Sequence, residues 1–133
     1  MTKPAGNAAG QLRPLGQTCL VAVYGTLKKG RKNHGYLRRA RMLGADRLNT
    51  ICLLDLGPYP GAVLQRSEGI EVEVYSVSAR QLDRLDRLEG YRADQPALGL
   101  YDRMLVPTRF GRAWVYLYNK PRPSRKILRR GGW

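Results

Sequence analysis

The stretch from residue 70 to residue 90 limits the fold of this 133-residue sequence more than any other. Apolar and polar side chains alternate over 70–77, which predicts a β-strand with one buried face. Ser78 follows directly, and Gln81 lies three residues further on, which is the spacing of a capping box at a helix start. The helix is expected to end before Gly90, because glycine favours helix C-termini. A mixture of short strands and helices is compatible with a domain of mixed α and β structure but does not select one fold.

The last turn of the predicted helix carries a carboxylate on its apolar side. With about 100° per residue and Leu82 at zero, Leu85 lies at about 300° and Glu89 at about 340°. The helix is expected to run to about Leu88. The charged residues expected on the solvent side are Asp83, Arg84, Asp86 and Arg87. Burial disfavours a charged carboxyl, so we expect the Glu89 pKa to exceed its ordinary value of about 4.3. The alternative is that Glu89 turns to solvent or pairs with Arg92.

A second informative stretch is the apolar run Leu20–Val23, which predicts a buried strand. It is followed by the turn Tyr24-Gly25-Thr26-Leu27. Backbone N–H groups at the end of a buried strand can bind an anion or a polarised carbonyl, and Gly25 allows a ligand to approach the backbone closely. An ordinary tight turn would explain the same residues.

Several short motifs occur in a fixed order between about residues 20 and 119. They are Tyr24-Gly25-Thr26-Leu27, His34-Gly35-Tyr36-Leu37, Val72-Glu73-Val74-Tyr75, Leu85-Asp86-Arg87-Leu88-Glu89-Gly90-Tyr91, Tyr101-Asp102-Arg103 and Ala113-Trp114-Val115-Tyr116. Together they resemble the γ-glutamylcyclotransferase-like (AIG2-like) family, which includes the γ-glutamylamine cyclotransferases. The resemblance implies an α+β fold, a small mixed and partly closed β-barrel with flanking helices. It also implies a cofactor-independent enzyme of the acyltransferase or lyase type, which cyclises a γ-glutamyl amine or amino acid to 5-oxoproline and releases the free amine.

The resemblance also implies roles for individual residues. Glu89 falls on the catalytic glutamate of the family, and the backbone of Tyr24–Leu27 would hold the substrate carboxylate and the developing oxyanion. Tyr101 is a candidate substrate contact by its position. Glu73 lies where the family has an acid and is a second candidate carboxylate, although Val72 replaces the preceding glycine. On the solvent-facing side of its strand, Glu73 is equally explained as a surface acid.

Two other interpretations of the same fold remain open at the level of sequence. One is a related γ-glutamyl acyl-transfer enzyme, and the other is a non-catalytic module that binds a small molecule or RNA. The net charge of +14 bears on the second, because basic residues cluster over 28–41 and 120–130. A solvated basic surface explains these clusters as well, and no helix-turn-helix, zinc-finger or base-stacking motif accompanies them. Nucleic-acid binding is therefore not expected to be the main function.

The chain is the size of one domain. We divide it into a disordered leader over residues 1–16, the γ-glutamylcyclotransferase-like domain over 17–119 and a basic surface arm over 120–133. Within the domain we expect elements in addition to the strands and helix above. These are a short helix capped by Asn33, a strand pair around 45–56, a proline- and glycine-rich loop over 57–61, a loop over 92–99, a strand over 104–106 and a last strand over 113–118.

Composition restricts the remaining possibilities. No apolar run approaches the roughly 20 residues that span a bilayer, and no secretion signal is recognised before the first strand. Cys19 and Cys52 lie far apart in apolar surroundings, which favours buried, reduced thiols and a cytoplasmic location. His34 is the only histidine, so neither a histidine-rich metal site nor a triad is expected. With no P-loop or dinucleotide-binding pattern, we expect no cofactor. The family resemblance implies a small-molecule γ-glutamyl substrate.

Overall fold

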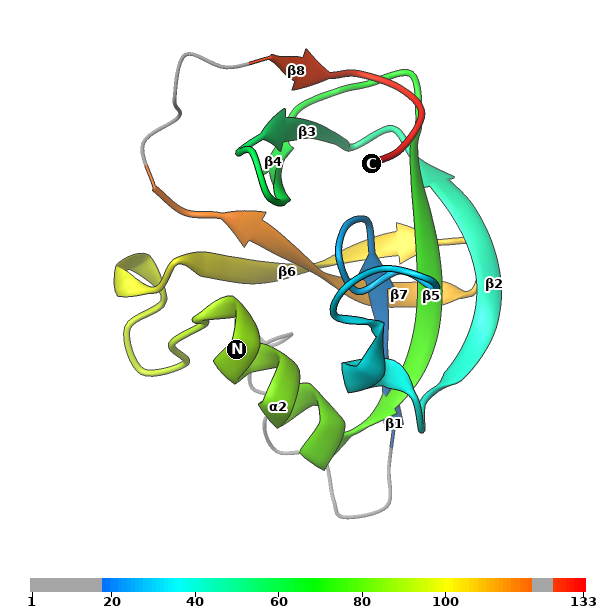
Figure 1. Ribbon diagram of the computed structural model, residues 1–133, viewed down its shortest axis with the longest axis vertical. Helices are drawn as coiled ribbons and strands as arrows, with labels where there is room; N and C mark the ends of the chain where they lie inside the picture. The colour runs from blue at the N-terminus through cyan, green and yellow to red at the C-terminus, as the bar shows by residue number, and fades with distance from the viewer. Residues whose placement is uncertain (1–17, 121–125) are drawn as a thin grey trace.

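The computed structural model describes residues 18–120 and 126–133 and contains a strongly curved mixed sheet that forms a half-barrel (Figure 1). The strands are β1 (Thr18–Val23), β2 (Arg41–Leu48), β3 (Ile51–Asp55), β4 (Pro60–Leu64), β5 (Ile70–Ser78), β6 (Tyr101–Thr108), β7 (Gly111–Tyr118) and β8 (Ile127–Leu128). The helices are α2 (Ala79–Glu89) and the single-turn 3₁₀ helices η1 (His34–Leu37) and η2 (Pro96–Leu98). This architecture confirms the predicted fold class. Among the described residues, no helix is long and apolar enough to cross a membrane.

The sheet has the strand order β2-β5-β1-β7-β4-β3-β8, and β6 pairs with the other edge of β7. β1 runs antiparallel to β5 and parallel to β7, which it meets at Ala113 and Trp114. β4 also runs parallel to β7, but meets it further along, at Leu117. Two strands therefore share one edge of β7 in succession. The turn that follows β1 leaves the sheet at the seam between them.

Two hydrophobic clusters lie on opposite faces of this sheet. One contains Trp114 and Tyr116 of β7 and is covered by Leu82 and Leu85 of α2. The other contains Ala113 and Val115 of β7 together with Ile70, Val72 and Val74 of β5. The alternation predicted over 113–118 is therefore confirmed. Cys19 and Cys52 are both buried thiols, as predicted.

The junction between β5 and α2 also agrees with the sequence prediction. Ser78 accepts a hydrogen bond from the Gln81 backbone, and the Gln81 side chain accepts one from Ser78, which forms the complete capping box. Gly90 ends the helix in a left-handed conformation, with φ of 69°. These two caps fix the ends of the helix, and Glu89 is its last residue.

Several local predictions are wrong in detail. The helix near Asn33 is the 3₁₀ turn η1, and Asn33 does not cap it, because its amide donates instead to Thr26 Oγ1 at 3.0 Å. The strands predicted around 45–56 exist as β2 and β3 but do not pair with each other: β2 pairs with β5, and β3 with β4. The predicted loop over 57–61 is shorter, since Pro60 and Gly61 already belong to β4.

The strand predicted over 104–106 is longer and spans Tyr101–Thr108. The strand predicted over 113–118 begins at Gly111, and it is followed by one more strand, β8. β8 pairs with β3, and Gly131 bridges to Ile70. Trp133 packs against the second cluster. Residues 126–133, which we predicted to be part of a surface arm, therefore return to the sheet. The predicted leader over 1–16 and residues 121–125 lie outside the described residues.

Candidate active site

Glu89, the last residue of α2, lines two adjoining hollows. The larger has a volume of about 400 Å³. Its walls are formed by Thr26, Lys32, Asn33, Pro58, Tyr59, Leu88, Leu100 and Tyr101 in addition to Glu89. The smaller, about 20 Å³, separates Glu89 from the turn at the end of β1 and is also lined by residues 22–27 and Tyr116. A volume of this size holds about one water molecule. Glu89 therefore faces the turn across a narrow gap, on the side that the helical wheel predicts.

The environment of Glu89 favours its protonated form. Burial raises the pKa of Glu89 to about 7. Within the described parts of the chain the carboxyl makes no ion pair, and Arg92, the alternative partner, pairs instead with Asp94 at 3.5 Å. A carboxyl with a pKa near neutrality can both accept and return a proton at neutral pH.

The turn that faces Glu89 is held by its own hydrogen bonds. The Tyr24 hydroxyl donates to the Tyr116 carbonyl at 2.7 Å and accepts from the Ala62 N–H at 3.1 Å, so it bridges β7 and β4 at the seam. The Thr26 carbonyl accepts a hydrogen bond from the Asn33 N–H at 2.8 Å. By contrast, the N–H groups of residues 25–27 donate to no other described residue. The same three residues line the smaller hollow opposite Glu89.

Gly25 occupies a position with no room for a side chain. A Cβ atom there would lie 2.7 Å from Cγ and 2.9 Å from Cδ of Pro60. We expect Gly25→Ala to lower the free energy of unfolding by about 1–3 kcal/mol, because the rigid proline ring or the turn must move. Denaturant unfolding measures this loss. Gly35→Ala is the matched control, since its nearest neighbour is the end of the Arg38 side chain at 3.9 Å, and a similar loss in both variants would contradict the prediction.

Tyr101 lines the larger hollow, as its predicted role requires. Its hydroxyl donates to the Pro60 carbonyl at 2.9 Å, and its ring meets Tyr118 edge-on with the centroids 5.6 Å apart. These contacts hold the ring in place as one wall of the hollow. A contact between Tyr101 and a ligand would therefore be made mainly by the ring, because the hydroxyl is already engaged.

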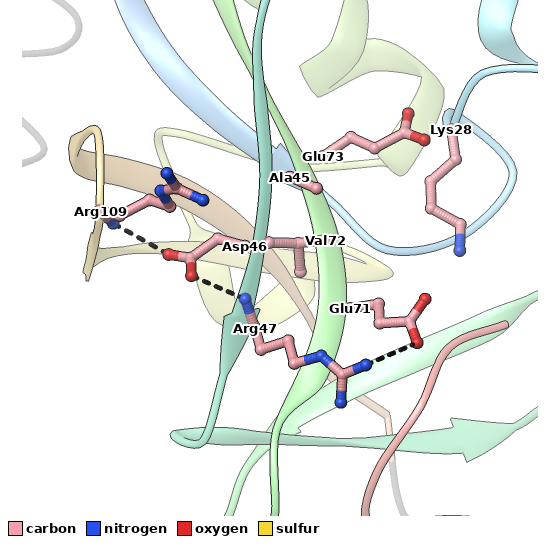
Figure 2. Close-up of a pocket in the computed structure, with 8 residues that line it drawn as sticks. All are labelled: Lys28, Ala45, Asp46, Arg47, Glu71, Val72, Glu73 and Arg109. Carbon is pink, nitrogen blue, oxygen red and sulfur yellow. Dashed lines mark hydrogen bonds and ion pairs between the residues drawn. The ribbon is translucent and has the colours of Figure 1, made fainter.

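The structure does not bring Glu73 to either hollow that Glu89 lines. Its carboxylate accepts hydrogen bonds from the Lys29 N–H at 2.8 Å and from the Tyr75 hydroxyl at 3.0 Å. Figure 2 shows it at a separate hollow over β2 and β5. In this position Glu73 fixes the loop that follows the turn.

Asp86 was predicted to face solvent, and this is wrong. Its carboxylate accepts hydrogen bonds from Arg103 Nε at 2.9 Å and from the Tyr116 hydroxyl at 2.7 Å. The Arg103 side chain is only 1% exposed and lies against the rings of Tyr91 and Trp114, at 4.4 and 4.1 Å from the ring centroids. Burial raises the Asp86 pKa, and the Arg103 charge opposes this shift.

A signal for this ion pair is present in the sequence. Asp86 lies only about 40° from Leu82 on the helical wheel, at the border of the apolar side. Arg103 lies two residues after Tyr101 and therefore on the same face of its strand. The pair joins α2 to β6 and β7, one helical turn before Glu89.

Comparison with known proteins identifies the family of this chain. The family model described as "Gamma-glutamyl cyclotransferase, AIG2-like" matches residues 21–133. A "Putative gamma-glutamylcyclotransferase" of Vibrio cholerae is 36% identical over 115 residues, which cover 86% of this chain and 94% of the relative. The solution structure of the protein ytfP from Escherichia coli is 34% identical, covers 86% of this chain and 95% of its own, and has a TM-score of 0.67.

A further relative is the "Gamma-L-glutamyl-butirosin B gamma-glutamyl cyclotransferase" of Niallia circulans. It is 35% identical over 105 residues, which cover 74% of this chain and 65% of the relative. The match of the family model over residues 21–133, together with these identities, assigns the family. The chain belongs to the gamma-glutamyl cyclotransferase, AIG2-like family.

Proposed function

We propose that this protein is a γ-glutamyl cyclotransferase that converts a γ-glutamyl amine or amino acid to 5-oxoproline and the free amine. The observation that carries the proposal is the narrow gap between Glu89 and the turn at residues 25–27. In the proposal, Glu89 is the base on one side of this gap, and the backbone N–H groups of residues 25–27 are the donors on the other side. The reacting group of the substrate would lie between them. The name of the Niallia circulans relative supports the same class of reaction.

In the proposed reaction the α-amine of the γ-glutamyl group attacks its own γ-carbonyl carbon. Glu89 takes a proton from the attacking ammonium, the new C–N bond forms, and the oxyanion is met by backbone N–H groups of residues 25–27. The bond to the leaving nitrogen then breaks as Glu89 returns the proton to it. In total two protons pass from the attacking to the leaving nitrogen, one at a time. The larger hollow would hold the leaving group and keep the glutamyl chain folded.

The pH dependence of the reaction provides a direct test. Because Glu89 must be ionised to accept a proton and its pKa is about 7, kcat/KM should rise about tenfold per pH unit below pH 7 and level off above it. The measurement is the release of 5-oxoproline from a panel of γ-glutamyl amines and γ-glutamyl amino acids. A pH profile in which kcat/KM does not change slope near pH 7 would contradict the proposed role of Glu89.

The same panel separates the proposal from the other interpretations. Release of the amine without formation of 5-oxoproline would indicate γ-glutamyl transfer to water or to another acceptor. Saturable binding of γ-glutamyl compounds without any turnover would indicate a binding module. Either result would overturn the proposed cyclisation.

A further inference from the structure

A third large hollow lies at the opposite end of α2 from Glu89. Its volume is about 620 Å³, which is within the range of small-molecule sites. It lies between η1 and the first turns of α2, and is lined by Gly35, Tyr36, Arg38, Arg39, Ser78, Arg80, Gln81 and Arg84. Four of these residues are arginines and none is acidic. Tyr36 beside them is 43% exposed.

The four arginines are not neutralised within the described part of the protein. The ion pairs formed there involve other arginines, among them Arg87, which pairs with Asp83 on the same helix. All four arginines are exposed, so solvent screens part of their mutual repulsion, and an anion held between them would remove more of it. The N-terminal end of α2, an 11-residue helix, adds its partial positive charge to the same space.

The hollow over β2 and β5 shows that this pattern is not simply the result of the high net charge. There, Lys28, Arg47 and Arg109 are matched by Asp46, Glu71 and Glu73 (Figure 2). Arg47 pairs with Glu71 at 3.5 Å, and Asp46 accepts a hydrogen bond from the Arg109 backbone at 2.9 Å. That hollow is balanced by its own residues, whereas the hollow beside η1 is not.

We propose that the hollow lined by Arg38, Arg39, Arg80 and Arg84 binds the oligophosphate group of a small molecule. Guanidinium groups bind phosphate oxygens through paired, charge-assisted hydrogen bonds, and several converging on one space match several adjacent phosphates. The volume of about 620 Å³ and the single aromatic side chain among the lining residues favour a small molecule over a long nucleic-acid strand, which needs an extended track with repeated stacking. Where the ligand carries a base, Tyr36 is placed to stack on it.

The test is calorimetric titration of the full chain with tripolyphosphate, ATP and a single-stranded RNA oligomer. We expect saturable binding of tripolyphosphate with one site per chain, weakened by added salt. Arg84→Ala should weaken it about tenfold or more, because a charge-assisted hydrogen bond is lost. Arg87→Ala is the matched control: it removes the same charge from the same helix, three residues away, but from an arginine that has a partner.

The outcomes distinguish the ligand source and can overturn the proposal. Tighter binding of ATP that depends on Tyr36 would identify a nucleotide, whereas equal binding of ATP and tripolyphosphate would identify the phosphates alone as the recognised group. Absence of saturable binding, or equal losses in Arg84→Ala and Arg87→Ala, would overturn the proposal. Binding of RNA alone, equally sensitive to Arg129→Ala at the far basic cluster, would indicate a general basic surface instead. The proposal is independent of the proposed cyclisation, because none of these residues lines the hollows at Glu89.

Discussion

Glu89→Gln is expected to lower kcat/KM for 5-oxoproline formation by about 10²- to 10⁴-fold, the usual contribution of a positioned general base. Glutamine keeps the size and shape of the side chain but cannot take a proton from the attacking ammonium. Steady-state measurement of 5-oxoproline release at pH 8 checks this result. Retained turnover in this variant would contradict the assignment of Glu89 as the general base.

The same substitution is expected to stabilise the protein at neutral and alkaline pH. The pKa of Glu89 is raised from 4.5 to about 7 in the folded state, so the folded protein holds a proton more tightly than the unfolded chain. The stability linked to that proton is fully present below about pH 4.5 and is lost as the pH rises through about 7. At 1.36 kcal/mol per pKa unit, ionisation of Glu89 costs up to about 3 kcal/mol, which glutamine avoids.

Denaturant unfolding at pH 4 and pH 8 separates this effect from a general change in packing. The two proteins should be equally stable at pH 4, and Glu89→Gln should be more stable at pH 8. Asp83→Asn is the matched control on the solvent side of the same helix, where the side chain is 59% exposed, and it should show no comparable gain. A loss of stability in Glu89→Gln at both pH values would show that the carboxylate is needed for packing.

Arg103→Met is expected to lower the free energy of unfolding by about 3 kcal/mol or more. Breaking a buried ion pair leaves an uncompensated charge, and the Asp86 side chain is only 16% exposed. Methionine retains much of the apolar contact with the Tyr91 and Trp114 rings, so the loss reports mainly on the charge. Arg130→Met is the matched control, because Arg130 pairs with Glu68 at the surface, where such pairs contribute about 0–1 kcal/mol.

The pH dependence of Arg103→Met provides a second check. Without the arginine, burial remains the largest influence on Asp86 and is opposed only by the hydrogen bond from Tyr116, so the Asp86 pKa in the folded state should rise further. A raised pKa means that stability is lost as the pH rises, so the deficit of Arg103→Met should be larger at pH 8 than at pH 4. An equal deficit at both pH values would contradict the role of the Asp86 charge. Addition of Asp86→Asn to Arg103→Met should recover part of the stability at pH 8.

The sequence predicted those features that local periodicity and capping determine. The capping box at Ser78, the end of α2 before Gly90 and the inward direction of Glu89 all follow from spacing within one helix. The faces of β7 follow from alternation alone. These signals are local, and the structure agrees with them.

The differences arise where partners come from distant parts of the chain. The pairing of β2 with β5 and of β8 with β3 depends on which strands the curved sheet brings together, and short apolar runs carry little information about this. The inward position of Asp86 depends on Arg103, 17 residues further along the chain. A polar residue at the border of an apolar face is buried only if such a partner is supplied.

The seam at which β1 gives way to β4 along β7 has a consequence for the chemistry of the fold. A strand that paired with β7 along its whole length would use its own backbone N–H groups in sheet hydrogen bonds. It would leave none of them for a ligand. Here the Tyr24 hydroxyl bridges the Tyr116 carbonyl and the Ala62 N–H, and the N–H groups of residues 25–27 donate to no other described residue. In the proposed reaction, the oxyanion donors thus come from an interruption in the sheet's hydrogen bonding, and Glu89 supplies the ionisable group beside them.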